Sequence, residues 1–137
     1  VAAAIGNGGK VMTPYLVQRV VSSDLQTIEG PQQHDLGDAI SPGTAEQLTQ
    51  MMTDVVAEGT GTPAQIPGVQ VAGKTGTAQH GEGAAPHAWF TGFAPASSPK
   101  VAVAVVVEDG GQAGSEAAGG TVAGPIAKAV MEAVLNS

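Results

Sequence analysis

The chain has 137 residues, of which 42% are hydrophobic and 12% are charged, so it can bury a core and does not have the composition of a disordered segment. Its five basic residues are scattered and its net charge is −7, which excludes nucleic-acid binding as an expected function, because such binding depends on clustered Lys and Arg. Cysteine is absent and the three histidines have no tight metal spacing, so we expect no disulfide and no metal site.

The chain opens with a short helical segment followed by a hairpin. Residues 1–5 are apolar and precede a Gly-Asn-Gly-Gly sequence, which is typical of the end of a helix. Residues 11–21 are predicted to be extended, with an interruption at Pro14, which cannot supply a ladder N–H. Residues 27–29 are the candidate partner strand.

A longer helix is predicted from Ser41 and Pro42 onward. Ser suits the N-cap, and Pro suits the first helical position because the N–H that it lacks would be unpaired there. Apolar side chains then recur at helical spacing until residues 58–63, which are rich in Gly and Thr, end the pattern. Met51 and Met52 are both expected to pack in the core.

Three extended runs follow, at residues 69–79, 88–93 and 101–107. Short links rich in Gly, Pro and Ser join them, which favours antiparallel hairpins over crossovers. The third run is apolar at every position and rich in Val, so we predict that it is the most central strand. Three of the chain's few aromatic residues fall in the second run and are expected to form an isolated cluster: Trp89, Phe90 and Phe93.

A final helix is predicted over residues 121–136, after a flexible glycine-rich loop at residues 110–120. Pro125 is placed in its first turn, where no intrahelical donor is lost. One side of this helix is apolar and is assigned to the core: Val122, Ile126, Ala129, Val130, Ala133 and Val134. The predicted fold is α/β (α+β), an antiparallel sheet with a C-terminal helix packed on one face.

The sequence Lys74-Thr75-Gly76-Thr77 is the one segment whose chemistry exceeds the needs of packing. Side chains alternate along a strand, so Lys74 and Gly76 share one face and the two threonines share the other. The strand thus offers a cation, two hydroxyls and a position where another chain can approach closely, which suits an extended peptide that ends in a carboxylate. From these residues alone, an edge-strand Lys that snorkels between β-prone threonines is the favoured interpretation.

The surrounding sequence favours the functional interpretation. Three consecutive segments together resemble the C-terminal half of class B penicillin-binding proteins. They are Val-Ala-Gly-Lys-Thr-Gly-Thr-Ala-Gln at 71–79, Trp-Phe-Thr-Gly-Phe-Ala-Pro at 89–95, and the valine-rich run that follows. Asn-Gly-Gly at 7–9 and Gly-Gly at 119–120 match the same family in order. The chain is most similar to the actinobacterial penicillin-binding protein A group.

This resemblance implies a role for each residue of the motif. In the family, a serine attacks a peptidoglycan stem peptide ending in D-Ala-D-Ala, or a β-lactam antibiotic, and forms an acyl-enzyme, so the resemblance implies that no cofactor is used. Lys74 would then assist proton transfer and attract the substrate carboxylate. Thr75 and Thr77 would hold that carboxylate, the Thr77 N–H would donate to the oxyanion, and Gly76 would admit the substrate backbone.

The nucleophile itself is expected to lie outside this chain. Ser97 and Lys100 fit the Ser-x-x-Lys spacing, but Lys100 leads directly into a predicted strand, whereas the catalytic pair needs a helix start. No Ser-x-Asn occurs in the sequence. We therefore interpret Ser97 as a residue of a hairpin turn.

The remaining polar candidates are interpreted as surface residues. His80 and His87 flank the loop after the motif strand and are expected to be solvated, with a pH-sensitive or substrate contact as the alternative. Trp89 is assigned to the core or to the floor of a cleft. Four acidic residues are expected to be loop charges: Glu82, Glu108, Asp109 and Glu116.

The resemblance predicts that residues 1–137 are the C-terminal part of a transpeptidase domain, with 1–67 ending the helical region and 68–137 supplying the motif strand, two further strands and the last helix. The missing N-terminal part of the domain would be its partner, and an upstream anchor would hold the enzyme at the outer face of the cell membrane, where cell-wall synthesis sets cell shape. A D,D-carboxypeptidase, a β-lactam-sensing domain and a non-catalytic module that binds peptide C-termini remain alternatives.

Overall fold

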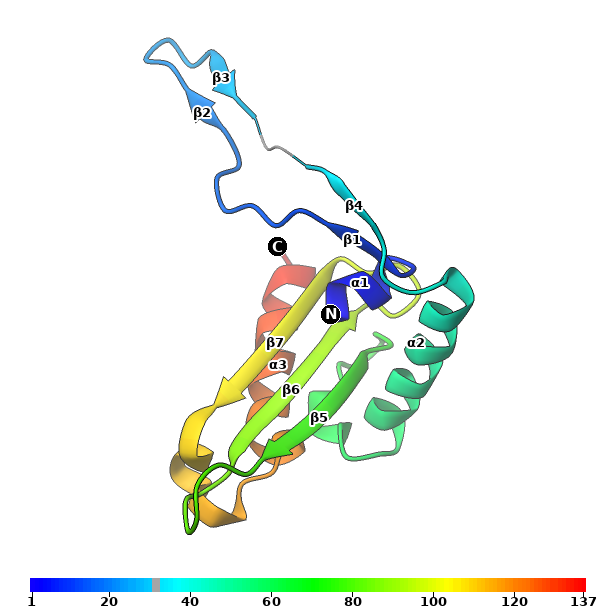
Figure 1. Ribbon diagram of the computed structural model, residues 1–137, viewed down its shortest axis with the longest axis vertical. Helices are drawn as coiled ribbons and strands as arrows, with labels where there is room; N and C mark the ends of the chain where they lie inside the picture. The colour runs from blue at the N-terminus through cyan, green and yellow to red at the C-terminus, as the bar shows by residue number, and fades with distance from the viewer. Residues whose placement is uncertain (31–32) are drawn as a thin grey trace.

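The computed structural model describes residues 1–30 and 33–137. Its main sheet contains three antiparallel strands in the order β5-β6-β7: β5 (Ala72–Ala78), β6 (His87–Ala94) and β7 (Val101–Val107) (Figure 1). Successive hairpins join them, as the short links predict.

Helices lie on both faces of this sheet. α3 (Gly119–Leu135) covers one face, α1 (Ala2–Gly6) lies over the other, and α2 (Pro42–Ala57) runs beside β5 (Figure 1). Two apolar clusters result: one joins Phe90 to α3, and the other joins Phe93 to α1. The predicted antiparallel sheet with a C-terminal helix packed on one face is confirmed.

β7 is not the most central strand, contrary to the prediction. Among the described strands it pairs only with β6, and its residues alternate between half-buried and exposed. Two consecutive hairpins place the middle strand at the centre of the sheet whatever its composition. An apolar strand therefore lies at an edge, with Val106 42% exposed.

α3 begins two residues earlier than predicted and presents a different face to the core. Ala118 is its N-cap, so Pro125 lies inside the helix and not in its first turn. The buried stripe consists mainly of small residues that let the helix approach the sheet closely: Gly119, Gly120, Ala123, Gly124, Ala127 and Met131. Ile126, Val130 and Val134, which hydropathy assigns to the core, are each 44–45% exposed. Hydropathy favours large apolar side chains and overlooks a glycine-alanine stripe.

α2 begins and ends as its sequence predicts. The Ser41 hydroxyl accepts a hydrogen bond from the Thr44 N–H, and Pro42 occupies the first turn. At the other end, Gln65 donates to the carbonyls of Val56 and Ala57, which have no partner within the helix.

The methionine pair of α2 divides between core and solvent. Met52 is buried beside α1, but Met51 is 56% exposed, so only one of the two packs as expected. Adjacent helical positions point about 100° apart, and a helix at the margin of a sheet buries only a narrow stripe.

An extended arm precedes α2 and projects from the body of the protein (Figure 1). The predicted hairpin is confirmed as β2 (Val20–Val21) paired with β3 (Thr27–Glu29). A second, unpredicted pair joins β1 (Lys10–Met12) to β4 (Asp35–Asp38).

An ion pair closes the base of this arm. The Lys10 ammonium lies 2.8 Å from the Asp35 carboxylate, and this hydrogen bond lowers the pKa of Asp35 and raises that of Lys10. Short 3-10 segments complete the chain, η1 (Thr62–Ala64) and η2 (Glu108–Glu116). No helix in residues 1–30 and 33–137 combines the length and the apolar character needed to cross a membrane.

Candidate functional site

The Lys74–Thr77 segment lies on β5, at the edge of the main sheet. Among the described residues β5 pairs only with β6, so the backbone groups of alternate residues face an open edge. The predicted alternation is confirmed, because Thr75 stands opposite Phe90 of the α3 cluster, whereas Lys74 stands opposite Thr91 on the other face.

The Lys74 side chain is exposed and reaches along its own strand. Its ammonium donates a hydrogen bond of 2.6 Å to the Thr75 carbonyl. Within the described residues, the Lys74 ammonium at the open edge thus has one hydrogen-bond partner, a neighbouring backbone carbonyl that a ligand could replace.

Thr75 is tied to the turn that follows α2. Its hydroxyl lies 2.7 Å from the Thr60 hydroxyl, and either oxygen can be the donor. Thr75 is half-buried, whereas Thr77 is exposed. One hydroxyl of the segment is therefore fixed in place and the other is free to meet a ligand.

Gly76 lies directly beneath the start of α3. A Cβ atom on Gly119 would lie 2.4 Å from the Gly76 carbonyl oxygen and 2.8 Å from its nitrogen, so the helix touches the strand backbone here. The first turn of α3 thereby supports the segment from the face opposite Lys74.

The three aromatic residues of β6 do not form one cluster. Phe90 and Phe93 are fully buried on opposite faces of the sheet, because they are three positions apart along a strand. Trp89 is 42% exposed, so it is not a core residue. It pairs with Gly76 and therefore borders the segment on the Lys74 face, which agrees with the cleft-floor alternative.

Ser97 and Lys100 lie in the connection between β6 and β7. Both are exposed, and the Lys100 N–H donates to the Ala94 carbonyl to close the turn. The expected hairpin-turn position of Ser97 is confirmed, and no helix start is present there.

Sequence reasoning missed a cluster beyond the end of β5. His80 and His87 are half-buried, not solvated, and their rings stack with centroids 3.7 Å apart. His80 Nε2 lies 2.9 Å from the carboxylate of Asp109, which is therefore more than the loop charge that its sequence position indicates. The three residues come from separate segments, so no local spacing could have indicated the cluster.

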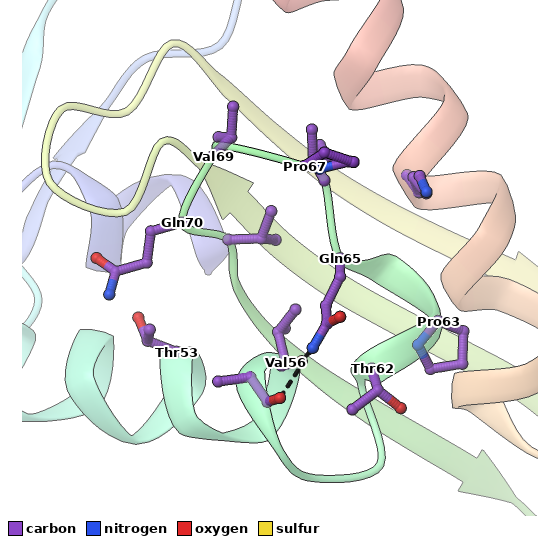
Figure 2. A pocket seen from close by; sticks show the side chains of 12 residues that line it. Thr53, Val56, Thr62, Pro63, Gln65, Pro67, Val69 and Gln70 are labelled. Carbon is purple, nitrogen blue, oxygen red and sulfur yellow. Dashed lines mark hydrogen bonds between the residues drawn. The ribbon is translucent and has the colours of Figure 1, made fainter.

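A pocket of about 550 Å³ lies between α2, residues 62–71 and α3. Figure 2 shows Gln65 and Thr53 at its walls, with the Gln65 amide bonded to the end of α2. None of its lining residues belongs to Lys74–Thr77. The pocket is therefore separate from the β5 edge.

Comparison with known proteins identifies the family. The sequence profile of the penicillin binding protein transpeptidase domain matches residues 1–132. The chain is 48% identical to the peptidoglycan D,D-transpeptidase PbpA of Mycobacterium tuberculosis over 99% of its length, and 37% identical to stage V sporulation protein D of Bacillus subtilis over 96%. It spans 28% and 21% of those two proteins.

Solved structures agree with this result. A structure of penicillin-binding protein A from M. tuberculosis, a ceftriaxone acyl-enzyme complex, superposes with a TM-score of 0.91 at 46% identity, covering 98% of this chain and 30% of the other. The predicted resemblance to class B penicillin-binding proteins of the penicillin-binding protein A group is confirmed. The chain belongs to the penicillin-binding protein transpeptidase family.

Proposed function

We propose that residues 1–137 are the C-terminal part of the transpeptidase domain of a peptidoglycan D,D-transpeptidase, and that β5 is its substrate-binding strand. The complete enzyme would cross-link stem peptides ending in D-Ala-D-Ala through a serine acyl-enzyme, at the outer face of the cell membrane. The relatives named as D,D-transpeptidases and the acyl-enzyme complexes of penicillin-binding protein A support this proposal.

The observation that carries the proposal is the open edge of β5 with its cation and two hydroxyls. An extended peptide can add to such an edge by main-chain hydrogen bonds. Lys74 would exchange its bond to the Thr75 carbonyl for a catalytic partner or the substrate carboxylate. The Thr75 and Thr77 hydroxyls would bind that carboxylate, and Gly76 leaves the edge unobstructed.

The nucleophilic serine and its lysine would be supplied from outside these 137 residues. Ser97 is the only serine here with a lysine three positions later, and it lies in a turn. We therefore infer that the remaining part of the domain is the chain's essential partner, and that β-lactams acylate a serine which that part contributes.

Acylation by a fluorescent penicillin tests the assignment in the complete enzyme. Replacing Lys74 by Ala removes a group that assists proton transfer, and such groups typically contribute a factor of about 10² to 10⁴. We expect the acylation rate to fall by at least 100-fold with an unchanged circular dichroism spectrum, because the side chain is exposed. Lys100→Ala is the matched control and should acylate normally.

Acylation of the Lys74→Ala protein at the wild-type rate would contradict the proposed role of β5. If the wild-type protein instead bound D-Ala-D-Ala peptides without ever being acylated, the non-catalytic peptide-binding module would be the correct alternative.

A further inference from the structure

The cluster of His80, His87 and Asp109 has the composition of a metal site. His80 follows the end of β5, His87 begins β6, and Asp109 follows the end of β7. One donor atom from each residue lies within 4.8 Å of the other two. Two imidazoles and one carboxylate are donors that suit zinc, which often takes three protein ligands and a water molecule.

The contact between His80 and Asp109 has the form expected of two ligands of one ion. His80 Nε2 is buried and makes no hydrogen bond within the described residues, although Asp109 Oδ1 lies 2.9 Å away. The two atoms are therefore close without pointing at each other. Two donors on a tetrahedral zinc, each at about 2.0–2.2 Å from the metal, are roughly 3.3–3.6 Å apart, so the two atoms need to separate by less than about 1 Å to bind one ion.

His87 supplies the third donor. Its Nδ1 lies 3.9 Å from Asp109 Oδ1 and accepts a hydrogen bond of 2.9 Å from the Asp109 N–H. The lone pair of Nδ1 is thus directed toward Asp109, and a bound cation would replace the N–H as its partner. The rings are only 15° from parallel, so the imidazole of His80 must turn for the two lone pairs to converge.

The local backbone accommodates that movement. His80 is attached to a loop in which Gly81 and Gly83 have φ values of +69° and +76°, a conformation that glycine adopts without strain. Only Ala84 lies within 4 Å of a Cβ placed on Gly81, and nothing lies within 4 Å of one placed on Gly83. The backbone that follows His80 is therefore uncrowded at both glycines.

We propose that His80, His87 and Asp109 bind one divalent transition-metal cation of the zinc type, with water completing its coordination. Mg²⁺ and Ca²⁺ are disfavoured because they select oxygen ligands. A bound ion would link the end of β5 to the connection between β7 and α3, and so fix the loop beside the Lys74–Thr77 strand. The site is independent of the proposed transpeptidase activity.

Isothermal titration of the untagged complete enzyme with ZnCl₂ tests the proposal. We expect one saturable site for Zn²⁺ and none for Mg²⁺. Loss of a hydrogen-bonding partner of a metal ligand typically weakens binding 10- to 100-fold, so loss of a ligand should cost at least tenfold. His80→Ala, His87→Ala and Asp109→Asn should each show that loss.

His34→Ala is the matched control, because His34 is the third histidine of the chain and is exposed on the arm. It should bind Zn²⁺ as tightly as the wild type. X-ray absorption should give zinc–ligand distances near 2.0–2.2 Å with two imidazoles in the shell.

Asp109→Asn changes neither the size nor the backbone of the residue, so it separates loss of a ligand from misfolding, and near-ultraviolet circular dichroism checks the fold of all four variants. The proposal is overturned if the wild type shows no saturable Zn²⁺ site, if Asp109→Asn binds within twofold of the wild type, or if His34→Ala weakens binding as much as His80→Ala does.

Discussion

Replacing Gly119 by Ala tests whether α3 must begin in direct contact with β5 and β6. The new Cβ would lie 2.1 Å from the Trp89 carbonyl oxygen and 2.4 Å from that of Gly76. Both atoms belong to the backbone, so no side chain can rotate away to relieve the overlap. The helix must shift away from the strand that carries Lys74.

The free energy of unfolding should fall by about 2 kcal/mol. Overpacking costs about 1–3 kcal/mol, and backbone overlap at two oxygens places this substitution near the upper limit. Ala also lowers the conformational entropy of the unfolded chain relative to Gly, and this effect offsets at most about 1 kcal/mol of the lost stability. For a domain of this size, 1 kcal/mol corresponds to about 3–4 °C, so Tm should fall by about 6–8 °C.

Thermal unfolding followed by circular dichroism at one fixed protein concentration measures this change. Gly124→Ala is the matched control on the same helix, because its Cβ would meet Pro63 and Ala64 at ordinary contact distances of 3.5 and 3.7 Å. Without a clash, Ala in a helix interior stabilises by about 0.5–1 kcal/mol, so this variant should melt about 2–4 °C higher. The reasoning fails if Gly119→Ala melts at or above the wild-type temperature, or if both variants lose the same stability.

Three further outcomes are expected. Ser97→Ala in the complete enzyme should leave penicillin acylation unchanged, and mass spectrometry that located the adduct on Ser97 would refute the turn assignment. The 137-residue chain alone should not be acylated, and it should not be monomeric, because the apolar Val101–Val107 strand has one open edge among the described residues. A stable monomer in a sedimentation experiment would refute the second expectation. The pairing of β1 with β4 should weaken in acid. Because the pKa of Asp35 is lowered, the contribution of its carboxylate to this pairing is complete above the ordinary pKa of 3.8 and is lost as pH falls through the lower folded-state pKa. The Lys10 pKa is raised, so at high pH the ion pair is lost only above pH 10.5. Amide NMR should show a smaller acid transition in Lys10→Met than in the wild type, because the hydrogen bond from the Gly37 N–H to the Asp35 carboxylate remains. A transition of undiminished size would assign it to another group.

Local patterns predicted the parts of the fold that depend on neighbours in sequence. The N-cap at Ser41 needs only the Thr44 N–H, and the alternation of Lys74 and Thr75 follows from the geometry of any strand. The hairpins between β5, β6 and β7 follow from short links. The Lys-Thr-Gly motif and its flanking strands are local patterns too, and they were sufficient to indicate the family.

Packing decided what those patterns left open. Which side of α3 is buried depends on how closely the helix approaches the sheet, and Gly120 and Ala123 allow an approach that Ile126 would prevent. The position of β7 depends on connectivity and not on its valines.

The sequence by itself determined that this protein carries a Lys-Thr-Gly strand of the penicillin-binding type, because motif, strand periodicity and short hairpins are all encoded within a few residues. Only the tertiary structure placed Gly119 directly over that strand, and only it brought Asp109 to His80 and His87. Contacts between distant segments depend on how the whole chain packs, and residue spacing along the sequence does not specify them.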